Sequence, residues 1–227
     1  ILTIEDPIEY RLGGISQAQV NTKKGFTFAT GLRAMLRLDP NVILVGEMRD
    51  LETAEIGLQA SLTGHLVLST VHANSSTQTV ARLVDMGAEG FTVASALQGV
   101  ISQRLVRKLC ESCKTSYQPS EKDLSELGLT RENAPKVFYK GKGCQQCHQE
   151  GYRGRLPVME ILLIHNDMRP LIKKNADPGL LFQKARDHGM LTMYDNGIEK
   201  IKAGVTTSDE VKRVLGVQTT TTTKLLR

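Results

Sequence analysis

Four cysteines form two closely spaced pairs, Cys110-x-x-Cys113 and Cys144-x-x-Cys147, with thirty residues between them. Two thiolates presented by each tight turn can complete a tetrahedral zinc site. A site closed by four sulfur ligands leaves no position for water, so the metal would stabilise the fold and take no part in catalysis. The sequence therefore predicts a structural zinc site at Cys110, Cys113, Cys144 and Cys147.

Disulfide bonds and thiol redox chemistry are the competing interpretations of these cysteines. Disulfides would require an oxidising compartment, and the sequence shows no export signal. Redox chemistry at one C-x-x-C pair would not need a second matched pair. His148 follows Cys147 directly and could replace a thiolate ligand, although four thiolates already fill the tetrahedron.

Acidic residues follow apolar runs in the first half of the chain. The run over residues 41–47 reads as a buried strand that ends in Glu47, and parallel sheets place their ligands at that end of a strand. The first run likewise ends in Glu5, Asp6 and, slightly later, Glu9. Neighbouring strand ends would bring these carboxylates to one crevice, where Mg²⁺ would offset their repulsion. The alternative is a set of ordinary solvated acids at a strand end and at an Asp-Pro turn.

Three arginines and one histidine could join the carboxylates. Arg33 and Arg37 stand four residues apart on a predicted helix face, and Arg49 follows the second strand. Guanidinium groups contact phosphate oxygens bidentately, which suits phosphoryl transfer. His72 follows the third predicted strand, at the same end as the carboxylates, whereas His65 precedes that strand. The alternative is ordinary surface arginines and hydrogen-bonded histidines.

Short apolar runs alternate with helical patterns over about the first 110 residues, which predicts an α/β fold with a parallel sheet. The predicted strands cover residues 1–5, 42–45 and 66–71. A helix is expected to end at Asp39-Pro40, and a second to begin after Asp50 and end at Gly64. Further helices are expected at 80–86, through 93–105 into the first cysteine pair, at 120–127, and from a capping box at 207–210 to about residue 215.

Composition excludes several classes of protein. The chain has 227 residues, 40% of them hydrophobic, which is enough for one full core and a small second unit. The sequence lacks an apolar run long enough for a membrane-spanning helix. Its net charge of +5 suits phosphate groups or an acidic partner, but 4% aromatic residues and no Trp leave few platforms for stacked bases. The apolar start without Met predicts a piece of a longer protein, and the Thr-rich residues 217–227 predict a disordered tail.

Four segments resemble, in chain order, the Asp box, arginine segment, Walker B strand and His box of one ATPase family. They are residues 4–9, 31–40, 44–50 and 63–72. The chain is therefore similar to the type II secretion and type IV pilus assembly ATPases, the GspE/PilB-like group. The resemblance continues through residues 103–107, both cysteine pairs and 151–155, and it omits only the Thr-rich tail. The four cysteines favour the assembly branch over the retraction motors.

The resemblance implies an α/β fold with a partial RecA-like P-loop ATPase core over residues 1–109, without its first strand and P-loop. It also implies a tetracysteine zinc unit at 110–155 and a mainly helical C-terminal subdomain at 156–216. ATP with Mg²⁺ and a structural Zn²⁺ are the implied cofactors.

Roles for individual residues also follow from the resemblance. Glu47 would be the catalytic glutamate of Walker B. Glu9 would order Mg²⁺ and water, with support from Glu5 and Asp6. Arg33, Arg37 and Arg49 would approach the phosphates. His72 would sense the γ-phosphate.

The family's partners are implied in the same way. Its members work as homohexameric rings at the cytoplasmic face of the inner membrane. There they transmit nucleotide-driven motion to a membrane platform protein and the secretion or pilus assembly proteins. No specific nucleic-acid partner is expected.

The sequence departs from the family pattern at the Walker A motif. Its one Gly-Lys pair, Gly141-Lys142, precedes Gly143 instead of a hydroxyl residue and lies between the cysteine pairs. Without a glycine loop the phosphates lose their main binding site, so we expect this chain alone to be inactive. The open alternatives are a non-catalytic ring adaptor and, with little aromatic support, a zinc-dependent nucleic-acid-binding module.

Overall fold

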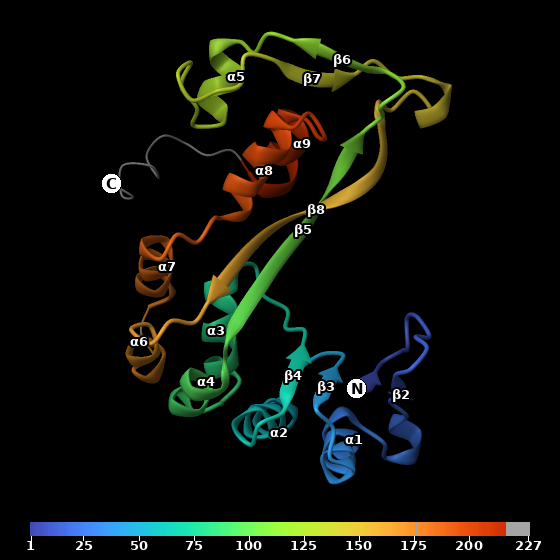
Figure 1. The fold of residues 1–227 in the computed structure, drawn as a ribbon, viewed down its shortest axis with the longest axis vertical. Helices are drawn as coiled ribbons and strands as arrows, with labels where there is room; N and C mark the ends of the chain where they lie inside the picture. The colour runs from blue at the N-terminus through green and yellow to red at the C-terminus, as the bar shows by residue number, and fades with distance from the viewer. Residues whose placement is uncertain (176, 217–227) are drawn as a thin grey trace. The chain divides into compact units, whose positions relative to one another are not determined.

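The computed structural model describes residues 1–175 and 177–216 (Figure 1). The chain forms two compact units. The first combines Ile1–Val100 with Leu162–Ala185, and the second contains Ile101–Ile161 and the chain from Arg186 onward. The predicted tail at 217–227 lies outside the described residues, and the predicted limits at residues 110 and 156 stay a prediction. No helix in the described ranges is long and apolar enough to cross a bilayer.

A four-stranded parallel sheet with the order β2-β1-β3-β4 forms the centre of the first unit. Ile4, Ile43 and Val45 lie on one face of the sheet and are fully buried, because they pack together with apolar side chains of α1. The predicted parallel sheet is confirmed, but β2 is missing from the predicted strands because its sequence, Ser-Gln-Ala-Gln, is polar. The strands are β1 (Leu2–Glu5), β2 (Ser16–Gln19), β3 (Val42–Val45) and β4 (Leu66–Ser69).

Helices α1 and α2 pack against this sheet, and both begin at side-chain caps. Thr27 and Asp50 accept hydrogen bonds from backbone N–H groups three residues on, and these bonds start α1 and α2. Helix α1 packs Leu32 and Met35 into the core of the sheet, and α1 and α2 lie side by side (Figure 1). The helices that lie in or begin in this unit are α1 (Phe28–Met35), α2 (Leu51–Leu62), α3 (Ser76–Asp85), α4 (Gly90–Ala96), α6 (Arg169–Lys173) and α7 (Pro178–Asp187), with the 3-10 turns η1 (Thr22–Lys24) and η2 (Leu36–Leu38).

The helix predicted through residues 93–105 is wrong. Helix α4 ends at Ala96, the backbone is already extended at Leu97, and β5 (Gly99–Leu109) follows. Strand β5 pairs with β8 (Tyr152–Leu163), which lies some fifty residues later in the chain. Ile101 and Leu105 are exposed, so the apolar spacing does not form one buried helical stripe. A local periodicity cannot reveal a partner strand so distant in sequence.

The second unit surrounds the cysteine segment with an apolar core. Strands β6 (Lys114–Tyr117) and β7 (Phe138–Gly141) form an antiparallel pair. The core combines Leu124, Leu127 and Phe138 with residues of the last two helices. The sequence suggests a unit held by something other than a core, and the structure corrects this because α8 and α9 supply the missing apolar side chains. The helices of this unit are α5 (Glu121–Glu126), η3 (Gln145–Cys147), α8 (Met193–Lys202) and α9 (Ser208–Leu215).

Helix α9 begins at the predicted position, but only half of the predicted capping box is present. Thr207 Oγ1 accepts a hydrogen bond from the Glu210 N–H at 3.1 Å. The Glu210 side chain, which is completely buried, instead accepts hydrogen bonds from the backbone N–H and guanidinium of Arg107 and from the guanidinium of Arg213. The buried carboxylate therefore connects α9 to β5.

Candidate functional site

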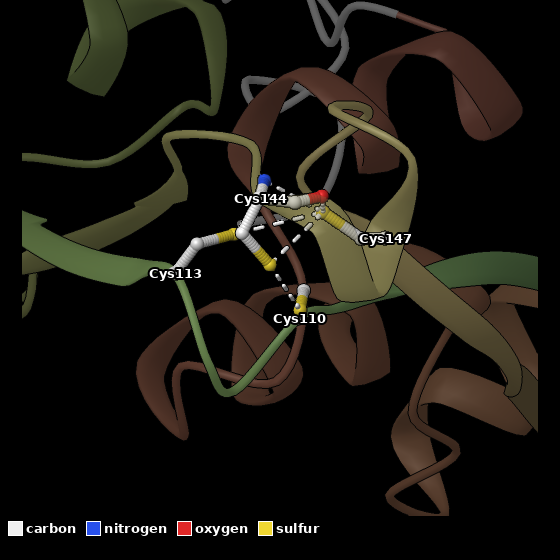
Figure 2. A group of neighbouring side chains, drawn as sticks. All are labelled: Cys110, Cys113, Cys144 and Cys147. Carbon is white, nitrogen blue, oxygen red and sulfur yellow. Dashed lines mark hydrogen bonds between the residues drawn. The ribbon is translucent and has the colours of Figure 1, made fainter.

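The two cysteine pairs come together in the second unit. The first pair follows β5, and the second lies at η3, beyond β7. All four Sγ atoms lie within 4.8 Å of one another (Figure 2). The Sγ–Sγ distances are 3.8 Å between Cys110 and Cys144, 3.8 Å between Cys113 and Cys147, and 3.7 Å between Cys144 and Cys147. These are too long for disulfide bonds, and all four cysteines are free thiols.

The sulfur distances fit a tetrahedral zinc site. Four sulfur atoms at about 2.3 Å from one zinc ion stand about 3.8 Å apart. Burial raises the pKa of the Cys147 thiol, but the backbone N–H groups of Cys144 and Gly151 point at its sulfur and lower the pKa to about 7. Such donors favour the thiolate that zinc requires. The four cysteines can therefore hold Zn²⁺ with no position left for water.

Glycines allow the segments before and after the second cysteine pair to approach closely. Gly151 has a φ of 78°, and a Cβ atom on it would lie 2.9 Å from the Gly141 carbonyl oxygen. The Cys110 N–H donates a hydrogen bond to the Gly151 carbonyl at 3.0 Å, which joins the two turns. His148 is exposed at the end of η3 and is not part of the sulfur cluster.

A second candidate site lies at the carboxyl end of β3. The Glu47 side chain is 13% exposed and forms an ion pair with the Arg49 guanidinium. His72 Nε2, which follows the neighbouring strand β4, lies 3.5 Å from Glu47 Oε2. Arg49 and His72 are 66% and 87% exposed, so solvent reaches this edge of the sheet. The structure thus brings together three of the predicted site residues.

The acids that follow β1 lie beside this edge. Strands β1 and β3 pair in parallel with Ile4 opposite Val45, so Glu5 and Gly46 are neighbours. A Cβ on Gly46 would lie 3.3 Å from the Glu5 Cα, which shows that the small residue accommodates β1. Asp6 and Glu9 are both exposed beyond the strand.

Glu5 has partners that the sequence does not reveal. Its Oε1 accepts hydrogen bonds from Thr3 Oγ1 at 2.6 Å and Gln17 Nε2 at 2.9 Å. These two bonds lower the pKa of the Glu5 carboxyl, with a smaller contribution from the Glu9 backbone N–H. Glu5 is therefore held as a carboxylate against β2, and the Glu9 backbone lies close to it. The parallel pairing of β1 with β2 explains Gln17, since it places that residue beside β1.

Arg33 and Arg37 do not share one α-helical face as predicted. Helix α1 ends at Met35, and Arg37 lies in the 3-10 turn η2 that precedes the left-handed Asp39. Arg33 forms an exposed ion pair with Glu52 of α2 at 2.7 Å. The predicted phosphate contacts of Arg33 and Arg37 stay predictions.

Comparison with known proteins places this geometry in a family. A family model described as "Type II/IV secretion system protein" matches residues 1–213. The chain belongs to this type II/IV secretion system protein family. Over 214 residues it is 51% identical to the "Type II secretion system protein E" of Pseudomonas aeruginosa, covering 94% of this chain and 42% of that protein. It is 46% identical over 210 residues to the "Type IV pilus assembly ATPase PilB" of Thermus thermophilus, with 92% and 24% covered.

Solved structures of related proteins confirm the α/β fold. The "Pilus Retraction Motor PilT" with bound ADP is 32% identical and superposes with a TM-score of 0.66, covering 94% of this chain and 51% of that one. The Legionella pneumophila ATPase DotB has the same fold at 22% identity, with a TM-score of 0.63 over 93% of this chain and 50% of that one. The chain thus spans roughly half or less of the length of these secretion system proteins.

Proposed function

We propose that this member of the type II/IV secretion system protein family supplies the residues that activate water for ATP hydrolysis in a motor ATPase. The motor would hydrolyse ATP with Mg²⁺ to power type II protein secretion or type IV pilus assembly. The observation that carries the proposal is the Glu47 carboxylate at the carboxyl end of β3, with Arg49 and His72 in contact with it.

The arrangement at Glu47 suits the activation of a water molecule. A carboxylate that is mostly shielded but reaches a solvent-accessible edge can orient the water that attacks a γ-phosphate. Arg49 neutralises Glu47 here, and its exposed guanidinium can turn to a phosphate oxygen when nucleotide is bound. His72 stands beside the same carboxylate, where it can respond to the γ-phosphate.

The other acids and arginines would complete the site. Glu9 would order Mg²⁺ and water, supported by Glu5 and Asp6, because oxygen ligands suit this ion. Arg33 and Arg37 would approach the phosphates, in part across a subunit boundary of a homohexameric ring. The Walker A loop that holds the phosphates does not occur in this sequence, so tight ATP binding would require residues outside it.

The cysteine centre would hold a structural Zn²⁺, as its sulfur distances support. The motor would work at the cytoplasmic face of the inner membrane, with a platform protein and the assembly proteins as partners. The names of the relatives support a role in type II secretion or type IV pilus assembly.

A chimera tests the proposed hydrolysis. Residues 1–216 would replace the matched 214-residue segment of the Pseudomonas aeruginosa relative, which supplies the rest of the motor. We expect the chimera to hydrolyse ATP, and Glu47→Gln to lower kcat about 100-fold to 1000-fold with ATP binding retained. Glu55→Gln, which changes an exposed glutamate of α2, is the matched control and should leave kcat unchanged. Unchanged turnover in Glu47→Gln would contradict the proposal.

A further inference from the structure

The backbone on either side of Glu47 is hydrogen-bonded to a neighbouring segment, to β1 on one side and to the residue after β4 on the other. On the β1 side, the Gly46 N–H donates a hydrogen bond to the Ile4 carbonyl at 2.8 Å. On the β4 side, the Met48 N–H donates to the Thr70 carbonyl at 2.9 Å. The residues before and after Glu47 are therefore both fixed by backbone hydrogen bonds.

The Thr70 side chain adds a third attachment to the same peptide. Thr70 Oγ1 donates a hydrogen bond to the Gly46 carbonyl oxygen at 2.7 Å. That carbonyl belongs to the peptide bond between Gly46 and Glu47, so its orientation sets where the Glu47 side chain begins. Gly46 has no side chain to restrict its backbone, which makes an external attachment more important.

We propose that Thr70 is a positioning residue for Glu47. Its carbonyl holds the peptide after Glu47 and its hydroxyl holds the peptide before it, so the residue that follows β4 contacts the backbone on both sides of Glu47. Thr70 also lies two residues before His72, which approaches Glu47 Oε2 directly. The end of β4 thereby fixes the glutamate and presents the histidine beside it. This inference rests on the proposed ATP hydrolysis at Glu47.

The two hydrogen bonds of Thr70 should affect the turnover of ATP more than its binding. A general base must hold water within a few tenths of an ångström of its attacking position, and misplacement by about 1 Å can cost about 100-fold in rate. Thr70 is exposed, so water can satisfy the Gly46 carbonyl when the hydroxyl is lost. Loss of the hydroxyl should therefore loosen Glu47 without unfolding the first unit.

Three variants of the chimera test this inference by steady-state ATP hydrolysis. Thr70→Val keeps the shape but removes the hydroxyl, and we expect kcat to fall about tenfold or more with KM within about threefold. Thr70→Ser keeps the hydroxyl and should stay within about threefold of the parent kcat. Thr115→Val is the matched control, because Thr115 Oγ1 also donates to a backbone carbonyl, that of Lys140 at 3.3 Å, but lies in β6 of the second unit.

The 227-residue chain provides a readout that does not depend on ATP. Amide hydrogen exchange of Met48 should be about tenfold faster in Thr70→Val than in the parent, and close to the parent in Thr70→Ser. Parent-like kcat in Thr70→Val, or equal losses in Thr70→Val and Thr70→Ser, would overturn the positioning role. If Glu47→Gln retains turnover, the proposed hydrolysis itself fails, whereas the exchange of Met48 still reports whether Thr70 holds this peptide.

Discussion

The chain holds two candidate sites whose residues are brought together differently. We call them the cysteine centre, formed by the four cysteines, and the Glu47 edge, formed by Glu47, Arg49 and His72. The cysteine centre brings four identical ligands together at zinc-like distances, and every ligand comes from within this sequence. The Glu47 edge brings together Glu47, Arg49 and His72, while Arg33 pairs elsewhere with Glu52.

This difference reflects the chemistry of the two sites. A structural metal site is satisfied by its own ligands, and its formation is coupled to folding. A phosphoryl-transfer site is completed by nucleotide, Mg²⁺ and a phosphate-binding loop, so its residues stay near solvent and pair with one another meanwhile. The comparison predicts that changes at the cysteine centre affect stability, whereas changes at the Glu47 edge affect turnover.

Removal of zinc should have the largest effect on the fold. We expect about one zinc per chain by elemental analysis and a large loss of structure in the second unit when a strong chelator removes the metal. Cys144→Ser should reproduce this loss, because three thiolates do not close the tetrahedron. Gln145→Ser, at the exposed neighbouring position, is the control that should retain the metal. A chain that is free of metal and equally stable would contradict the zinc site.

Glu210 should produce the next largest effect, since its carboxylate is completely buried in the second unit. Glu210→Gln leaves Arg107 and Arg213 without their carboxylate, and we expect a loss of about 3 kcal/mol in the free energy of unfolding. Chemical denaturation at neutral pH measures this loss. Glu199→Gln, which affects an exposed ion pair of α8, should cost less than about 1 kcal/mol. Equal effects of the two substitutions would contradict the structural role of Glu210.

The contribution of Glu210 should also depend on pH. Burial raises the pKa of the Glu210 carboxyl, but the Arg213 and Arg107 hydrogen bonds outweigh it and lower the pKa to about 2. Its stabilisation is therefore present above the ordinary pKa of 4.5 and is lost as pH falls towards 2. The difference in unfolding free energy between the parent and Glu210→Gln should narrow below about pH 4.5. A difference that widens on acidification would contradict this assignment.

Arg33 should give the smallest effect on stability. Its pair with Glu52 is exposed on both sides, so Arg33→Ala should lower the free energy of unfolding by less than about 1 kcal/mol. In the chimera, the proposed approach of Arg33 to phosphate predicts a larger effect on ATP turnover than on stability. Thermal unfolding and steady-state hydrolysis of the same variant distinguish the two. A large loss of stability with normal turnover would place Arg33 with the structural residues.

The sequence predicts those parts of the molecule that depend on local patterns. Apolar runs identify β1, β3 and β4, and the Cys-x-x-Cys spacing identifies all four members of the sulfur cluster. The position of Glu47 at the carboxyl end of β3 is predictable, because parallel strands bring the residues that follow them to one edge of the sheet. These features need no knowledge of residues distant in the chain.

Features that depend on distant partners could not be predicted in this way. The apolar spacing of the β5 sequence is typical of a helix, and only its pairing with β8 shows that it is a strand. The position of Glu210 is typical of a helix cap, and only the structure shows its hydrogen bond from Arg107, about a hundred residues earlier. Thr70 is one of many hydroxyl residues until its contact with Gly46 is visible. The polar β2 is equally hidden because its pairing with β1 leaves no apolar signal.

Phosphate release by the 227-residue chain and by the chimera, measured side by side with ATP and Mg²⁺, tests the central claim most directly. On the proposed function, this chain carries Glu47 and its partners but not the main phosphate-binding loop. We therefore expect no hydrolysis by the chain alone, and hydrolysis by the chimera that Glu47→Gln lowers about 100-fold to 1000-fold. Hydrolysis by the isolated chain, or by the Glu47→Gln chimera at the parent rate, would contradict that claim.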